Sequence, residues 1–317
     1  MPIVRKAAFW IITGVLVCAP ASVAEVYLRS VGLGNPILFY ANASYRFAPQ
    51  PNQKQVRIRG ATVTVDSKGF RSTKDWSESA DAKILFIGAS VTWGGTFIDD
   101  NDLFSEGVCQ RLARSTGKRY ICANTGANQY GIDNMAERIR YKGVDDESAL
   151  VVTITTSNTT NGLVDAEGRF FFMRPPPQPF PALWEATTFV TWKLYHSLRP
   201  VTYRSDDDVR VAERSLRNLF AAIRESQRPG RQVLIVHSPH KYELHGHEGA
   251  LTKQVQSILA RTPFEVLDLH ASVSEAVGDG FYYDNDHLDV RGHHFFADQI
   301  ASRLGPLMKD GSTNGTH

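Results

Sequence analysis

The sequence predicts a three-layer α/β domain, in which a central parallel sheet of about five strands lies between helices. Apolar runs of strand length alternate along the chain with longer segments whose apolar residues recur every three or four positions. Such alternation is typical of a parallel sheet covered by helices on both faces. At 317 residues, the chain is long enough for one substantial domain and an N-terminal attachment.

The expected elements follow one another between residues 81 and 307, which we assign to the main domain. Strands are predicted near 83–88, 119–124, 149–155, 231–237 and 264–268. Helices are predicted near 102–115, 132–141, 207–226, 249–260 and 291–304. The polar tail 308–317 is expected to be disordered.

The first 30 residues have the pattern of a signal anchor or a cleaved signal peptide. Arg5 and Lys6 precede an apolar run over residues 7–24, and small residues at its end suit a signal peptidase. A helical pattern continues beyond Glu25, which favours an uncleaved anchor. Either reading exports the domain, which is then membrane-anchored and extracytoplasmic (periplasmic), or secreted if the segment is cleaved.

Two segments interrupt this simple plan. Residues 31–80 are expected to connect the N-terminal segment to the domain, with a short hairpin over 55–65. Residues 162–206 form an insertion rich in aromatic residues and proline. An insertion of this length is either a lid or binding loop, or a small satellite core.

Composition and local context argue against several functions and partners. The net charge is +2 with neutral histidines, and no basic stripe interleaves with aromatics, so nucleic-acid binding is not expected. Neither a cofactor nor a metal is expected. The histidines that cluster after the fourth predicted strand lack a zinc-site spacing; they are His237, His240, His245 and His247. Two buried free thiols at Cys109 and Cys122 are favoured over a disulfide between them.

A serine and a late Asp-x-x-His segment together indicate nucleophilic catalysis. Ser90 follows the apolar run 84–87, and Asp284 lies three residues before His287. A serine hydroxyl becomes an effective nucleophile when an imidazole accepts its proton and a carboxylate fixes that imidazole. Asp286 is the competing acid, but Asp284 is favoured because adjacent side chains such as those of Asp286 and His287 diverge.

Polar loops follow two further strands, where active groups of an open parallel sheet gather. They are Ala127-Asn128-Gln129-Tyr130-Gly131 and Thr156-Ser157-Asn158. With Ser90 and His287, these segments make residues 81–307 resemble the SGNH hydrolases, also called the GDSL esterase family. The resemblance implies a flavodoxin-like sandwich and an oxyanion site formed by the N–H of Ser90, the N–H near Gln129 and the amide of Asn158.

Several positions depart from that family's pattern. Gly-Asp-Ser is Gly88-Ala89-Ser90 here, and the second-block glycine falls on Gln129, with Gly126 and Gly131 nearby. A side chain at residue 129 is expected either to narrow the site or to demand an unfavourable backbone conformation. The third block keeps Asn158 only, with Asn161 as its competitor.

The resemblance implies an extracytoplasmic serine esterase that removes acyl groups, with acetyl favoured, from a glycan or another ester. An O-acyltransferase acting on an exported polysaccharide is the alternative, because a sugar hydroxyl can replace water in the second step. A catalytically decayed glycan-binding or assembly subunit is the non-enzymatic alternative. The oligomeric state is not predicted by the sequence.

Overall fold

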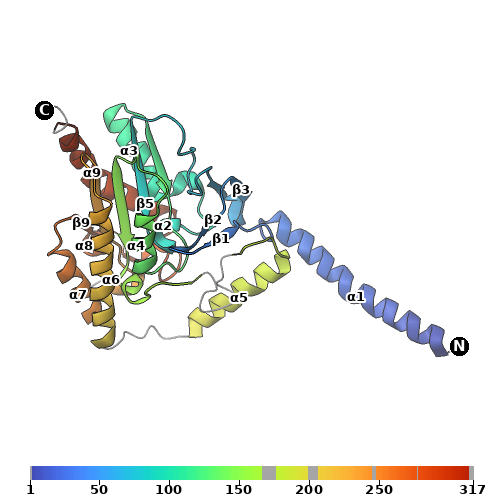
Figure 1. Cartoon of the computed structure of the whole chain (residues 1–317). Coiled ribbons are helices and arrows are strands. Elements are labelled where there is room, and N and C mark those ends of the chain that lie inside the picture. The colour runs from blue at the N-terminus through green and yellow to red at the C-terminus, as the bar shows by residue number, and fades with distance from the viewer. Residues whose placement is uncertain (1, 166–175, 199–205, 245–247, 277, 314–317) are drawn as a thin grey trace.

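A five-stranded parallel sheet forms the centre of the computed structural model, which describes residues 2–165, 176–198, 206–244, 248–276 and 278–313 (Figure 1). The strands are β5 (Ala82–Ile87), β6 (Tyr120–Asn124), β7 (Ala149–Ile154), β8 (Gln232–His237) and β9 (Glu265–Asp268). Their order across the sheet is β6-β5-β7-β8-β9, which is the flavodoxin-like order. The predicted parallel sheet of about five strands is therefore confirmed.

Alternate side chains of the strands pack against helices on opposite faces of the sheet. In β5, Ile84 and Phe86 face one apolar core, whereas Leu85 and Ile87 face the other. The first core includes residues of α3 (Phe104–Thr116), α8 (His270–Ala276) and α9 (Val290–Thr313). The second includes residues of α4 (Ile132–Arg140), α6 (Asp206–Glu225) and α7 (Ala250–Leu259). These two helical layers and the sheet make the expected three-layer sandwich.

The segment between residues 31 and 80 packs against this domain and contributes side chains to its core, in addition to linking the N-terminal helix to the sheet. It forms two antiparallel hairpins, β1 (Phe39–Asn42) with β2 (Arg46–Pro49), and β3 (Gln53–Val56) with β4 (Thr62–Val65). The β3–β4 pair matches the predicted hairpin. Several large apolar side chains of the segment are buried in the core shared with α4 and α6; they are Phe39, Phe47, Val63, Phe70 and Trp76.

The N-terminal residues form one long helix, α1 (Pro2–Ser30), which extends away from the sheet (Figure 1). No helix among the described residues combines the length and hydropathy needed to cross a membrane, so the expected anchor over residues 7–24 is not supported. The apolar run is interrupted by Thr13 and Pro20 and ends at Glu25. The Glu25 carboxylate instead accepts hydrogen bonds from the first backbone N–H groups of α5 (Ala182–Leu198).

The helical layer that contains α3 differs from the sequence prediction in two respects, the state of its cysteines and the length of its last helix. Cys109 in α3 and Cys122 in β6 form a disulfide, with their Cα atoms 5.8 Å apart, and are not free thiols. The reason is that α3 packs directly onto the strand that follows it, which brings the two cysteines together. Helix α9 also continues to Thr313, through part of the tail predicted as disordered, since Leu307 and Met308 pack against the same core.

Part of the insertion 162–206 lies within the described residues. Its helix α5 packs against α1, and its aromatic run Phe170-Phe171-Phe172-Met173 falls outside the described residues. Short helical turns complete the described chain: α2 (Ser90–Trp93), η1 (Ile58–Gly60), η2 (Asp100–Asp102), η3 (Thr156–Thr160), η5 (Lys241–Glu243) and η6 (Gly278–Phe281).

Candidate active site

The order of the strands creates a switch point at the carboxyl ends of β5 and β7. The chain leaves β5 for β6 on one side and later returns to β7 on the other, and open α/β sheets bind ligands at such a point. Ser90 follows β5 as the first residue of α2. The sharp turn before it needs Gly88, because a Cβ atom there would lie 1.9 Å from Thr92 Oγ1 and 2.9 Å from the Thr153 carbonyl oxygen.

Asp284 and His287 form the hydrogen-bonded pair expected from their spacing. Nδ1 of His287 lies 2.8 Å from Oδ2 and 3.0 Å from Oδ1 of Asp284. The backbone N–H groups of Asp286 and His287 also donate to Asp284 Oδ1, which closes the loop around the carboxylate. This arrangement fixes the ring of His287 and presents its Nε2 as the nitrogen that remains for another partner.

The charges of the pair shift both pKa values in the direction that favours a charged pair. Burial acts to lower the pKa of His287, but the hydrogen bond and negative charge of Asp284 outweigh it and raise that pKa above 6.5. Burial acts to raise the pKa of Asp284, whereas its hydrogen bonds from His287 and the backbone hold it below 3.8. An imidazole with a raised pKa is a stronger proton acceptor.

No hydrogen bond joins Ser90 Oγ to His287 among the described residues. The loops near these two residues are in contact. Phe97 lies in the loop after α2 and stacks on Tyr283, which precedes Asp284, with ring centroids 4.2 Å apart. Hydrogen bonds of a catalytic serine are often long without substrate and shorten only in the reacting complex. The structure therefore places the two residues on neighbouring loops without a direct bond between them.

The loops that follow β6 and β7 hold the other two predicted residues. Gln129 has φ +70°, in the left-handed region that a side chain disfavours, which is the unfavourable backbone conformation raised as one consequence of a side chain at this position. Asn158 accepts hydrogen bonds through Oδ1 from the N–H (3.2 Å) and the hydroxyl (2.9 Å) of Thr155, and its Nδ2 donates to the Tyr130 carbonyl at 3.3 Å. One of the two Nδ2 hydrogens is thus used by Tyr130, next to Gln129, and one is left for an acceptor.

The alternative candidates for these two positions, Gly126, Gly131 and Asn161, have other backbone conformations or other contacts. Gly131 has an extended backbone at the start of α4, and Gly126 is not in the left-handed region either. Asn161 ends the turn η3, and its N–H donates back to the Asn158 carbonyl. Gln129 and Asn158 therefore differ from these competitors in backbone conformation and in hydrogen bonds.

Asp286 pairs with a second histidine, His240, and this pair is not apparent from the sequence. One of its carboxylate oxygens lies 3.0 Å from Nδ1 of His240, and Nε2 of His240 lies 2.9 Å from Ser157 Oγ. This Ser157–His240–Asp286 chain joins the loop of Asn158 to the loop of His287. Only the fold brings these three residues together, since His240 follows β8, the strand next to β7.

A buried arginine from the N-terminal segment organises the loop that follows Ser90. Nε of Arg71 donates to Asp100 at 2.8 Å, and its other nitrogens donate to the carbonyls of Trp93, Gly95 and Ile98 at 2.5–2.6 Å. Its backbone also pairs with Asn124 at the end of β6. Arg71 therefore ties the second hairpin, the α2 turn and the edge strand into one scaffold.

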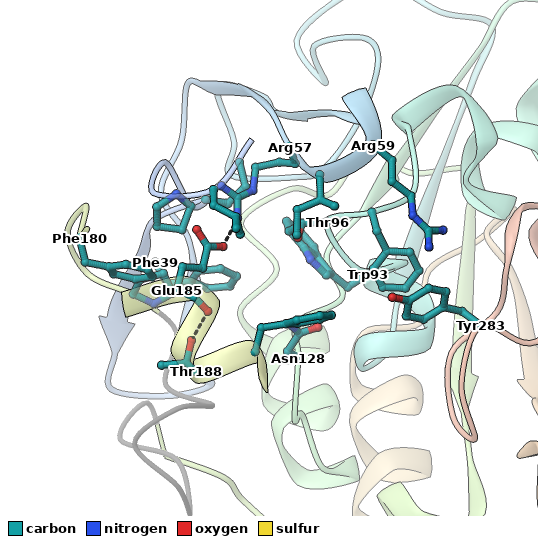
Figure 2. Close-up of a pocket in the computed structure, with 17 residues that line it drawn as sticks. Phe39, Arg57, Arg59, Trp93, Thr96, Asn128, Phe180, Glu185, Thr188 and Tyr283 are labelled. Atoms are coloured by element: carbon teal, nitrogen blue, oxygen red, sulfur yellow. Dashed lines mark hydrogen bonds and ion pairs between the residues drawn. The ribbon is translucent and has the colours of Figure 1, made fainter. Parts of the chain in front are cut away.

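A pocket of about 500 Å³ adjoins these loops (Figure 2). Three of its lining residues are close neighbours in sequence of predicted site residues: Trp93 lies in the turn of Ser90, Asn128 precedes Gln129, and Tyr283 precedes Asp284. Phe180 and Phe189 of the insertion line it as well. Figure 2 shows Arg57 paired with Glu185 at the side of the pocket formed by α5, and Arg59 beside Tyr283.

Within the described part of the chain, one group of side chains could ligate a metal ion. It consists of His237, Asp268 and His270, at the ends of β8 and β9. The sequence singled out His237 but not its two partners, which lie more than 30 positions further along the chain.

Known structures resemble the chain in part. No protein-family model matches it, and the search of curated proteins finds no significant match. A lipase/acylhydrolase from Enterococcus faecalis is 14% identical over 71% of this chain and 96% of its own, with a TM-score of 0.46. An acetyl xylan esterase variant from Geobacillus stearothermophilus is 14% identical over 72% and 96%, also with a TM-score of 0.46. Since these values are too low to show a family, the class of the protein rests on its own topology and residues.

Proposed function

We propose that the protein is a serine ester hydrolase with Ser90 as nucleophile, His287 as general base and Asp284 as the residue that orients His287. The observation that carries this proposal is the Asp284–His287 hydrogen bond at the edge of the sheet where Ser90 begins α2. Ser90 attacks the ester carbonyl while its proton passes to Nε2 of His287. The leaving alcohol takes that proton, and water then hydrolyses the acyl-enzyme.

The negative charge that develops on the carbonyl oxygen needs donors on the opposite side of the carbonyl from His287. The N–H of Ser90 belongs to the first turn of α2 and has no acceptor within the helix. The N–H of Gln129 and the second Nδ2 hydrogen of Asn158 complete the proposed oxyanion site. Retention of all of these groups, including the left-handed backbone at Gln129, speaks against the decayed, non-enzymatic alternative.

The substrate we propose is an acyl ester, with a short acyl group such as acetyl, carried by a glycan. Aromatic side chains line the pocket that adjoins the loops of the candidate site, and flat aromatic rings stack well on sugar rings; they are Phe39, Trp93, Phe97, Phe180, Phe189 and Tyr283. The Cys109–Cys122 disulfide supports the export inferred from the N-terminal segment, because disulfides persist mainly outside the cytoplasm.

The test is acetate release from an activated acetyl ester by the purified protein, with and without an oligosaccharide acceptor. A hydrolase should release acetate at a rate independent of the acceptor, and S90A should abolish the release. Formation of an acetylated sugar in proportion to the acceptor would favour the O-acyltransferase instead. Glycan binding without either activity in a folded protein would overturn the enzyme proposal.

A further inference from the structure

Two imidazoles and one carboxylate converge at the ends of β8 and β9, beneath the loops of the candidate active site. Nδ1 of His237 lies 3.4 Å from Oδ2 of Asp268, and Nδ1 of His270 lies 2.6 Å from Oδ1 of the same residue. The ligand atoms of all three side chains lie within 4.8 Å of one another. Three ligands that each lie about 2.0–2.2 Å from one ion are separated by roughly 3–4 Å, so small side-chain rotations suffice to surround an ion.

The second nitrogen of each imidazole faces another polar group. Nε2 of His237 lies 3.3 Å from Thr156 Oγ1. Nε2 of His270 is buried without a hydrogen bond and lies 3.6 Å from Oε2 of Glu243. Metal-binding histidines typically donate their other N–H to a carboxylate or similar acceptor, which fixes the ring and strengthens the ligand. Thr156 and Glu243 occupy these supporting positions.

The burial of the group suits an ion that solvent can reach from one side. His237 and His270 are 0% and 2% exposed, whereas the side chain of Asp268 is 34% exposed. The two histidines thus provide a dry, fixed side, and the aspartate provides an entry route and room for water as a further ligand. No cysteine takes part, so the donor set is nitrogen and oxygen only.

We propose that His237, Asp268 and His270 bind one divalent first-row transition metal ion. Two imidazoles and a carboxylate suit Zn²⁺ or Fe²⁺ and do not suit Mg²⁺, which prefers an all-oxygen octahedron. The ion would act as a brace and would not contact the reacting ester. Thr156, which supports His237, belongs to the turn of Asn158, and Glu243 accepts a hydrogen bond from the backbone of His240, whose side chain pairs with Asp286.

The test is a metal titration of the untagged full-length protein after removal of bound metal with a chelator. Zn²⁺, Fe²⁺ under anaerobic conditions, and Mg²⁺ are added separately and followed by calorimetry and thermal unfolding. We expect one equivalent of Zn²⁺ or Fe²⁺ to bind and to raise the melting temperature, with no effect of Mg²⁺. X-ray absorption of the bound zinc should show nitrogen and oxygen neighbours at about 2.0–2.2 Å and no sulfur.

Variants separate this site from other histidines. D268N should abolish binding, and E243Q and T156V, which keep the ligands, should each weaken it by roughly 10- to 100-fold. H294A removes an exposed histidine–aspartate pair, His294 with Asp102, and the double variant H245A/H247A removes two further histidines that follow Glu243 in the sequence; neither should change the affinity. The absence of saturable binding to the folded protein, unchanged binding in D268N, E243Q and T156V, or loss of binding in H245A/H247A would each overturn the proposal.

Discussion

The loop that carries His287 takes part in two histidine–aspartate pairs. The two pairs differ in whether Nε2 of the histidine contacts another group of the protein. In the first pair, Asp284 holds Nδ1 of His287, and Nε2 has no hydrogen-bond partner among the described residues. In the second pair, Asp286 lies against Nδ1 of His240, and Ser157 takes Nε2. The His287 side chain is 18% exposed and that of His240 only 4%.

The difference shows why a similar set of groups can serve two purposes. A general base needs one nitrogen that is fixed by a carboxylate and one that is open to the reacting proton. His287 has this arrangement, whereas the two nitrogens of His240 lie against Asp286 and Ser157 inside the protein. We therefore interpret the Asp284–His287 pair as catalytic and the Ser157–His240–Asp286 chain as a brace between the loops of Asn158 and His287.

Replacement of the two histidines should separate these roles most strongly. H287A removes the proposed base and should lower kcat on an activated acetyl ester by roughly 10⁴- to 10⁶-fold. H240A removes only a supporting contact and should lower kcat by less than about tenfold, while it lowers the melting temperature. If H240A remains folded and is as inactive as H287A, the two pairs have been assigned the wrong way round.

Replacement of the two aspartates should also separate the two pairs, with a smaller difference in kcat. D284N should lower kcat by roughly 10³- to 10⁴-fold, because the imidazole loses both its orientation and the charge that stabilises its protonated form. D286N should change kcat by less than about tenfold and should cost about 1–3 kcal/mol of unfolding free energy through the buried His240. An inactive D286N beside an active D284N would identify Asp286 as the orienting carboxylate.

Neighbouring residues in the turn η3 test the oxyanion site. N158A removes a donor to the developing negative charge and should lower kcat by roughly 100- to 1,000-fold with little change in KM. S157A removes the hydroxyl that contacts His240 and should mainly reduce stability, by about 1 kcal/mol. Equal losses of activity in the two variants would mean that the turn, and not the Asn158 amide, matters.

The pH dependence should report the pair that contains the base. Because the pKa of His287 is raised above 6.5 by Asp284, the neutral imidazole needed for catalysis is lost as pH falls through that raised value. We expect kcat/KM to decrease about tenfold per pH unit below it. In D284N this acidic limb should move to lower pH, whereas D286N should move it much less. An acidic limb that shifts equally in both variants would contradict the distinction.

The sequence was most informative where the relevant contacts are local. The alternation of strand and helix patterns predicted all five strands of the sheet, since each pattern reports the burial of its own segment. The Asp284–His287 pair needs only three residues of spacing, and an unfavourable backbone at Gln129 is one of the two consequences that the sequence suggested for a side chain there.

Contacts between distant segments were the ones that sequence reasoning missed. Arg71 reaches the loop after Ser90 because the N-terminal hairpins pack on the sheet, and His240 meets Ser157 because β8 lies beside β7. The sequence favours free thiols over the disulfide because a residue pattern does not show the packing of α3 on β6. In each case the order of strands and the packing of layers, and not the residue pattern, decide which side chains become neighbours.

The central claim is that Ser90 is the nucleophile activated by His287, and covalent trapping tests it most directly. The purified protein is treated at neutral pH with a fluorophosphonate, which reacts with activated serines, and the modified peptide is located by mass spectrometry. We predict one adduct on Ser90, absent in S90A, strongly slowed in H287A and retained in H240A. An adduct on Ser157 or elsewhere, or the absence of any adduct on the folded protein, would contradict the account.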